Sequence, residues 1–144
     1  MDKGPATRIN TGDEIPGLIA GPVTIQDIVE WCGAEGDYLS MHYDPDAARA
    51  AGLPGCVIQG TYKYGLLGKM VTDWAGTGGV LKKIGVRYVG MDFPGDTLTC
   101  RGRVTARYAA ADGHHVELEV WTENQRGERN TLGTASVTLG PLPT

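Results

Sequence analysis

Residues Gly60–Trp74, GTYKYGLLGKMVTDW, set the architecture of this chain. Apolar side chains recur along them at intervals of three and four residues: Tyr62, Leu66, Leu67, Met70, Val71 and Trp74. This spacing gives a helix one wide apolar face, so we expect a central helix that is mostly buried. The glycines in residues 76–79 end the pattern.

The chain after this helix alternates apolar and polar residues with the period of a β-strand. Four segments have this pattern, residues 84–89, 96–105, 114–121 and 132–140. The residues predicted to face inward are Ile84, Val86 and Tyr88; Leu98, Cys100 and Val104; Val116, Leu118 and Val120; and Ala135, Val137 and Leu139. Turn-forming residues separate the segments, most clearly Asp112–Gly113. The sequence therefore predicts an α+β fold, in which an antiparallel sheet wraps around one long helix.

Two shorter helices are expected before the central one. Thr24 is placed to cap a helix over residues 25–32, which Gly33 stops. Asp44 is placed to cap a second helix over residues 45–52, with proline first and glycine last. The segment between these helices therefore forms a loop that a rigid scaffold can aim.

The start of the chain has a different character. Residues 1–17 are rich in glycine and proline, and we interpret them as a flexible arm whose order depends on docking. A short strand is expected at residues 18–23. The length of 144 residues fits a single domain, which we place at residues 18–144.

Composition excludes several classes of protein. The formal net charge is -4 and the 13 basic residues are scattered, which argues against a nucleic-acid partner. The apolar runs are shorter than the ~20 residues that span a bilayer, so we expect no membrane association and a cytoplasmic location. The three cysteines lack a paired spacing, which indicates free thiols and predicts no metal site.

The loop between the short helices holds the residues best suited to chemistry. Asp37 and His42 stand five apart, and a carboxylate beside an imidazole can activate a water molecule. Gly60 opens the central helix, where free backbone N–H groups can bind an oxyanion. The local spacing alone fits equally well with an aspartate N-cap and a structural histidine.

The order of these elements resembles the hydratase motif of the MaoC-like hot-dog enzymes, the (R)-specific enoyl-CoA hydratases and dehydratases. Asp37, His42 and Gly60 fall on its positions. The resemblance implies a hot-dog fold and the reversible hydration of a 2-enoyl-CoA, with Asp37 and His42 holding the water. It implies that the Gly60 N–H receives the thioester carbonyl, with Gln59 and Tyr62 assigned to the same oxyanion and substrate-binding site. No cofactor is expected, because coenzyme A is part of the substrate.

This sequence departs from the family motif at three positions. Leu39 replaces the usual asparagine, Ser40 a frequent proline, and Gln59 the histidine that commonly precedes the glycine. These changes keep the acid/base pair and alter the secondary hydrogen bonds around it. We expect these three replacements to affect the rate of hydration or the choice of substrate.

A second resemblance concerns residues 71–90, VTDWAGTGGVLKKIGVRYVG. This segment looks like the short subunits of actinobacterial steroid side-chain hydratases, which work beside a related subunit. The resemblance implies a bulky or steroidal acyl-CoA and either a homodimer or a heteromer with a related MaoC-like subunit. On the same model, residues 1–17 are a candidate for wrapping the neighbour.

Other basic residues and two further histidines are also candidates for a functional role. Lys82 and Lys83 are the pair expected to contact coenzyme A phosphates, ahead of Arg49, Lys63 and Lys69. His114 and His115 open a strand, where alternation sends one inward and one outward, and a structural role is favoured for both.

Two other functions are also compatible with the sequence. A hot-dog acyl-CoA thioesterase would use the same helix-end amide with a carboxylate and water. A non-catalytic acyl-CoA-binding subunit of a hydratase complex would explain the loss of the asparagine at Leu39. The intact Asp37 and His42 pair argues against the second possibility.

Overall fold

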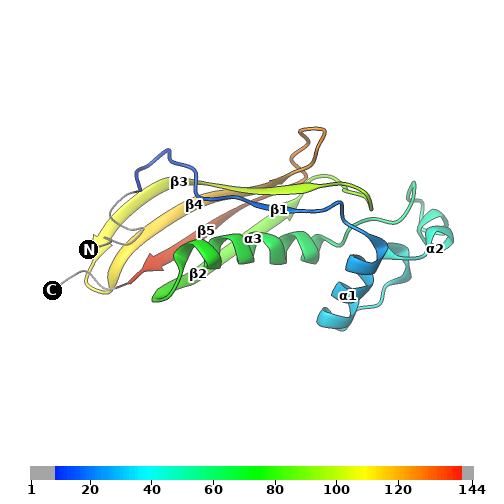
Figure 1. Ribbon diagram of the computed structural model, residues 1–144, viewed down its shortest axis with the longest axis horizontal. Coiled ribbons are helices and arrows are strands. Elements are labelled where there is room, and N and C mark those ends of the chain that lie inside the picture. The colour runs from blue at the N-terminus through cyan, green and yellow to red at the C-terminus, as the bar shows by residue number, and fades with distance from the viewer. Residues whose placement is uncertain (1–8, 141–144) are drawn as a thin grey trace.

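A computed structural model describes residues 9–140. Figure 1 shows one long helix, α3, lying along the concave face of a curved sheet, with two shorter helices beyond one end of it. The helices are α1 (Ile25–Glu35), α2 (Pro45–Ala50) and α3 (Gly60–Ala75), and a 3-10 turn covers Ser40–His42. The strands are β1 (Leu18–Ala20), β2 (Gly79–Tyr88), β3 (Leu98–Ala110), β4 (Gly113–Glu123) and β5 (Thr131–Leu139).

The core lies between α3 and the sheet, as the helical spacing predicts. Leu67, Met70 and Val71 of α3 are buried against inward-facing residues of the strands, among them Val104, Val116, Leu118, Val120, Ala135 and Val137. Removing this apolar surface from water supplies the main force that holds the helix on the sheet.

The sheet is antiparallel throughout, with the strand order β1-β3-β4-β5-β2. The predicted hairpin is present, since Ala110 pairs with Gly113 across the turn. The predicted inward residues are buried or packed on the core, except that Tyr88 is 49% exposed. Tyr88 ends β2 beyond the core, and its ring lies against the first residue of α3 instead.

Both predicted helix caps are confirmed. The Thr24 side chain accepts a hydrogen bond from the Asp27 N–H, and the Asp27 carboxylate accepts one from the Thr24 N–H. The predicted stop at Gly33 is wrong, because α1 continues to Glu35. Gly36, with a φ of 72°, adopts the left-handed conformation that ends it. A glycine inside a helix costs only about 1 kcal/mol relative to alanine, which is too little to end a capped helix.

The second short helix also follows its caps. Asp44 accepts from the N–H groups of Asp46 and Ala47, and Pro45 occupies the first position. The helix ends at Ala50, two residues before the glycine expected to close it.

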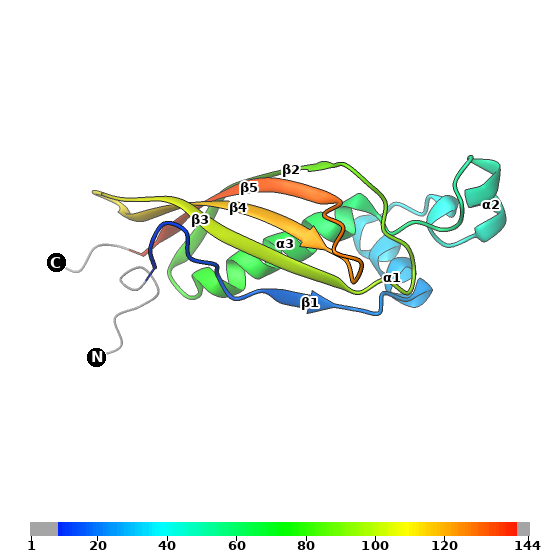
Figure 2. The same cartoon turned by 90° about the horizontal axis from the view of Figure 1, so that it is seen from above.

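Residues 9–17 of the expected arm dock along β3. Ile9 and Ile15 are buried in the core, and the Ile15 N–H donates to the Gly102 carbonyl at 2.9 Å. Residues 1–8 lie outside the described residues, and wrapping of a neighbour by this segment stays a prediction. In Figure 2 the first described residues of the chain approach the sheet at the end opposite α1 and α2.

Two further sequence expectations concern cysteines and membrane spans. Cys32, Cys56 and Cys100 are buried and free, as predicted. Within residues 9–140, no helix is both long enough and apolar enough to cross a membrane.

The connection before β3 is held by a carboxylate. Arg126 donates to both oxygens of Asp96, at 2.9 and 3.0 Å, and the Phe93 N–H and Gln125 side chain also donate to it. The hydrogen bonds from Arg126 are the main reason that the pKa of Asp96 is lowered from 3.8 to about 2.

Asp96→Asn should therefore lower the free energy of unfolding by about 1–2 kcal/mol at pH 7. The folded-state pKa is depressed, so this stabilisation is complete above about pH 4 and is lost as the pH falls toward about 2. Urea unfolding of both proteins between pH 2 and 7 measures the difference. Asp46→Asn, in an exposed pair with Arg49, is the control. A gap between wild type and Asp96→Asn that stays constant over this range would contradict the account.

Candidate active site

A cavity of about 470 Å³ lies at the N-terminal end of α3. Asp37, His42 and Gly60 all line it, the first two from the loop between α1 and α2 and the third from the start of α3. Its remaining walls are largely apolar and include Met41, Leu53, Val57, Ile58, Tyr88 and Met91. The structure thus brings the predicted acid/base pair and the helix-end glycine to one site.

Asp37 is positioned by the end of α1. After the Gly36 cap, the Asp37 N–H donates to the Cys32 carbonyl at 3.1 Å, which turns the chain toward the cavity. One carboxylate oxygen accepts from the Leu39 N–H at 3.2 Å. The side chain is exposed, so the remaining oxygen can accept a hydrogen bond from water.

His42 is oriented by a backbone carbonyl. Its Nδ1 lies 2.8 Å from the Val57 oxygen, in the segment that leads into α3. Because a carbonyl can only accept, Nδ1 carries the proton, and neutral His42 keeps a lone pair on Nε2. That nitrogen can take a proton from water.

Gly60 starts α3 without a side-chain cap. Its N–H belongs to the first turn, whose donors have no acceptor within the helix, and the helix dipole adds positive potential there. The preceding Gln59 is buried and turns away, donating to the Ile28 carbonyl at 2.9 Å. Its Oε1 is buried without a partner among residues 9–140. The Gln59 side chain therefore ties α3 to α1, while the residue also forms part of the cavity lining.

Tyr62, assigned from sequence to the same site, does not line the cavity. Its ring packs edge-on against Trp31, with 5.7 Å between the centroids. It also packs against a small group of buried apolar residues: Val23, Ile28, Ile58 and Leu98. Tyr62 follows Gly60 by two residues, a rotation of about 200° around the helix, which points its side chain toward α1.

Lys82 and Lys83 also lie outside the cavity. Both are exposed on β2, five and six residues before Tyr88, which places them about 15–20 Å along the strand from the cavity. Contact with coenzyme A phosphates by this pair stays a prediction.

The structure adds a buried ion pair that sequence reasoning missed. Lys63 Nζ lies 3.0 Å from Asp92, and their side chains are 2% and 1% exposed. The expectation that Lys63 can contact coenzyme A phosphates as a surface residue is wrong, because its side chain is buried and paired with Asp92. Lys63 lies one turn before buried Leu67, and this four-residue spacing was the signal available in the sequence.

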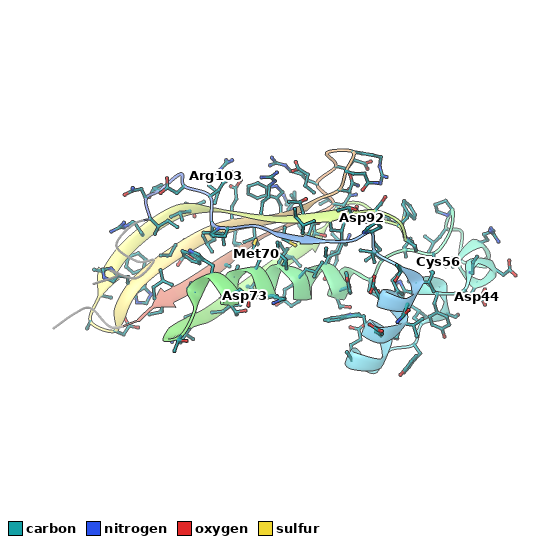
Figure 3. All side chains as sticks on the ribbon, in the orientation of Figure 1. Asp44, Cys56, Met70, Asp73, Asp92 and Arg103 are labelled. Carbon is teal, nitrogen blue, oxygen red and sulfur yellow. The ribbon has the colours of Figure 1, made fainter. Side chains whose placement is uncertain are left out.

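Asp92 also binds two further segments of the chain, the β4–β5 connection and the segment before α3. Its Oδ1 accepts from the side-chain amides of Asn124 and Asn130, each at 2.9 Å, and its backbone carbonyl accepts from the Ile58 N–H at 2.9 Å. Figure 3 shows Asp92 close to the N-terminal end of α3. The network fixes the first turn of α3 against the β2–β3 connection, which forms one wall of the cavity.

The sequence is similar to known proteins over most of its length. The family model of the MaoC like domain matches residues 10–135. The beta subunit of 3-oxo-4,17-pregnadiene-20-carboxyl-CoA hydratase from Mycobacterium tuberculosis is 37% identical over 79 residues, 55% of this chain and 61% of that protein. Enoyl-CoA hydratase ChsH3 from the same organism is 30% identical over 102 residues, 67% of this chain and 35% of that protein. The chain thus spans less than two thirds of either relative.

Solved structures give the same fold. The ChsH1-ChsH2 complex from Mycobacterium tuberculosis contains a chain with a TM-score of 0.79 and 28% identity, covering 90% of this chain and 98% of that one. The (R)-hydratase from A. caviae involved in PHA biosynthesis has a TM-score of 0.80 at 20% identity, covering 92% and 98%. The predicted hot-dog fold is confirmed.

Lys63→Met should lower the free energy of unfolding by about 3–5 kcal/mol, because it leaves the Asp92 carboxylate buried without its cation. Lys69→Met is the matched control, since Lys69 lies on the same helix in an exposed pair with Asp73 and should change stability by less than about 1 kcal/mol. Chemical denaturation measures both.

A second variant separates charge from packing. Lys63→Met combined with Asp92→Asn removes both charges and keeps an acceptor for Asn124 and Asn130, so it should recover much of the lost stability. Equal stability of wild type and Lys63→Met would contradict the assigned role of the pair.

Proposed function

The chain belongs to the MaoC-like domain family, and from that membership we propose that it catalyses the reversible hydration of a 2-enoyl-CoA thioester to a 3-hydroxyacyl-CoA. The observation that carries the proposal is the single cavity lined by Asp37, His42 and the uncapped Gly60 amide. Each of the three groups needed for this addition is present there.

The proposed reaction follows from the hydrogen-bonding capacity of these groups. Water binds between the Asp37 carboxylate and His42 Nε2, and its oxygen attacks C3 while the pair accepts a proton. The electron pair of the double bond moves through C2 onto the thioester oxygen, where the Gly60 N–H stabilises the negative charge. The pair then delivers the proton it accepted to C2, which completes the addition of one water, and dehydration is the reverse.

The substrate class is inferred from the walls and from the relatives. Met41, Leu53, Val57 and Ile58 offer an apolar surface, which suits a hydrocarbon acyl group. Two relatives carry hydratase names, one of them with a pregnadiene carboxyl-CoA substrate. We therefore include a steroidal 2-enoyl-CoA beside short and long linear chains as a candidate substrate.

A second subunit is part of the proposal. Strand β2 pairs only with β5 in the described sheet, so its outer edge offers free backbone groups. Val80 on this strand and Val89 and Met91 just after it are exposed. We propose a homodimer or a heteromer with a related MaoC-like subunit, and the similarity to a chain of the ChsH1-ChsH2 complex supports the heteromer.

Asp37→Asn and His42→Ala should each lower the hydration rate by about two orders of magnitude or more, because each removes a positioned acid/base group. The assay follows absorbance of the enoyl thioester for short, long and steroidal 2-enoyl-CoAs, with the chain alone and mixed with a candidate partner. Circular dichroism checks that each variant is folded.

Two outcomes of this assay would reject the proposal. Near-wild-type turnover by either folded variant would exclude the pair as catalytic. Release of free thiol from acyl-CoA in place of hydration would favour the thioesterase alternative.

Light scattering should give a mass greater than that of one chain, because association covers the free edge of β2 and the exposed apolar residues beside it. Val80→Lys, which places a charge on this edge, should shift the equilibrium toward the monomer, whereas Thr105→Lys on an exposed position of β3 serves as the control. A fully active monomer that persists across protein concentrations would contradict the proposed association with a second subunit.

A further inference from the structure

The phenol end of Tyr88 rests on the first residue of α3. A Cβ added to Gly60 would lie 2.7 Å from the Cζ of this ring and 2.9 Å from its Cε1 and Cε2 atoms. The hydroxyl is one bond beyond Cζ, so it lies beside the helix end that carries the free N–H groups. This contact also gives Gly60 a second reason to be glycine, because any side chain would displace the ring.

The Tyr88 hydroxyl is free to act on a ligand. Tyr88 lines the same cavity as Asp37, His42 and Gly60. No hydrogen bond joins its hydroxyl to another group in residues 9–140, unlike that of Tyr64, which donates to the Ile84 carbonyl at 3.1 Å. Partial burial is the main reason that the pKa of Tyr88 is raised, so the phenol keeps its proton at neutral pH.

The Tyr88 ring also lies near the buried cation of Lys63. Lys63 Nζ lies 5.8 Å from the ring centroid, within the range at which a cation is attracted to an aromatic face. Lys63 is fixed in turn by Asp92, so the ring has two contacts that limit its motion, one with Lys63 and one with Gly60. A donor held in this way needs little reorganisation when charge develops nearby.

We propose that Tyr88 is a further catalytic residue, whose hydroxyl donates a second hydrogen bond to the thioester oxygen beside the Gly60 N–H. The inference rests on the proposed hydration. A carbonyl oxygen has two lone pairs, and an enolate oxygen gains charge that two donors stabilise better than one. The helix end supplies one donor along its axis and Tyr88 supplies the other from the side.

Tyr88→Phe tests this role because it removes the hydroxyl and keeps the ring on Gly60. We expect kcat to fall by about 10- to 100-fold, with KM changed by less than about threefold, since the lost bond strengthens mainly in the transition state. Tyr64→Phe is the matched control and should retain wild-type kcat. A kcat for Tyr88→Phe equal to that of the control would overturn the proposal.

A second readout is independent of turnover. The infrared stretching frequency of the carbonyl of bound butanoyl-CoA, which has no double bond to hydrate, should be lower than that of the free thioester and should rise in Tyr88→Phe. An unchanged frequency in the variant would reject Tyr88 as a donor. If wild type hydrates no enoyl-CoA, the proposed function fails, while this comparison still decides whether Tyr88 donates to a thioester.

Discussion

The buried pair of Lys63 and Asp92 is the constraint on which the site depends. Two charges removed from water are tolerated only when each has partners, and Asp92 accepts from Lys63, Asn124 and Asn130. These donors come from α3 and from the β4–β5 connection, while the Asp92 carbonyl holds the segment before α3. The segments must therefore meet in one arrangement, which places the Gly60 end of α3 against the wall that carries Tyr88.

The other side of the cavity is set by shorter-range interactions. The Gly36 cap ends α1 so that Asp37 follows at once, and the Val57 carbonyl fixes His42. Gln59 joins the two sides, because it precedes Gly60 and donates to the Ile28 carbonyl of α1. Apolar packing of α3 on the sheet supplies the stability, whereas these polar contacts decide where the reactive groups lie.

Much of the scaffold could be predicted because its signals are local. The spacing of Leu67 and Met70 predicted α3, Thr24 and Asp44 predicted their caps, and Asp112–Gly113 predicted the hairpin. The site was only partly predictable. Lys63 and Asp92 are 29 residues apart, and a lysine beside apolar positions gives no local sign of its partner. The direction of Tyr62 and the contact of Tyr88 with Gly60 depend on how α1 and β2 pack against α3, which no short segment encodes.

In the proposed reaction, Asp37, His42 and Gly60 together add water to an intact thioester. Mass spectrometry of the product formed from a turned-over 2-enoyl-CoA in water enriched in oxygen-18 tests it directly. Hydration should give a coenzyme A thioester that has gained one labelled water, with the label in a hydroxyl of the acyl group. A labelled carboxylic acid together with free coenzyme A would contradict it.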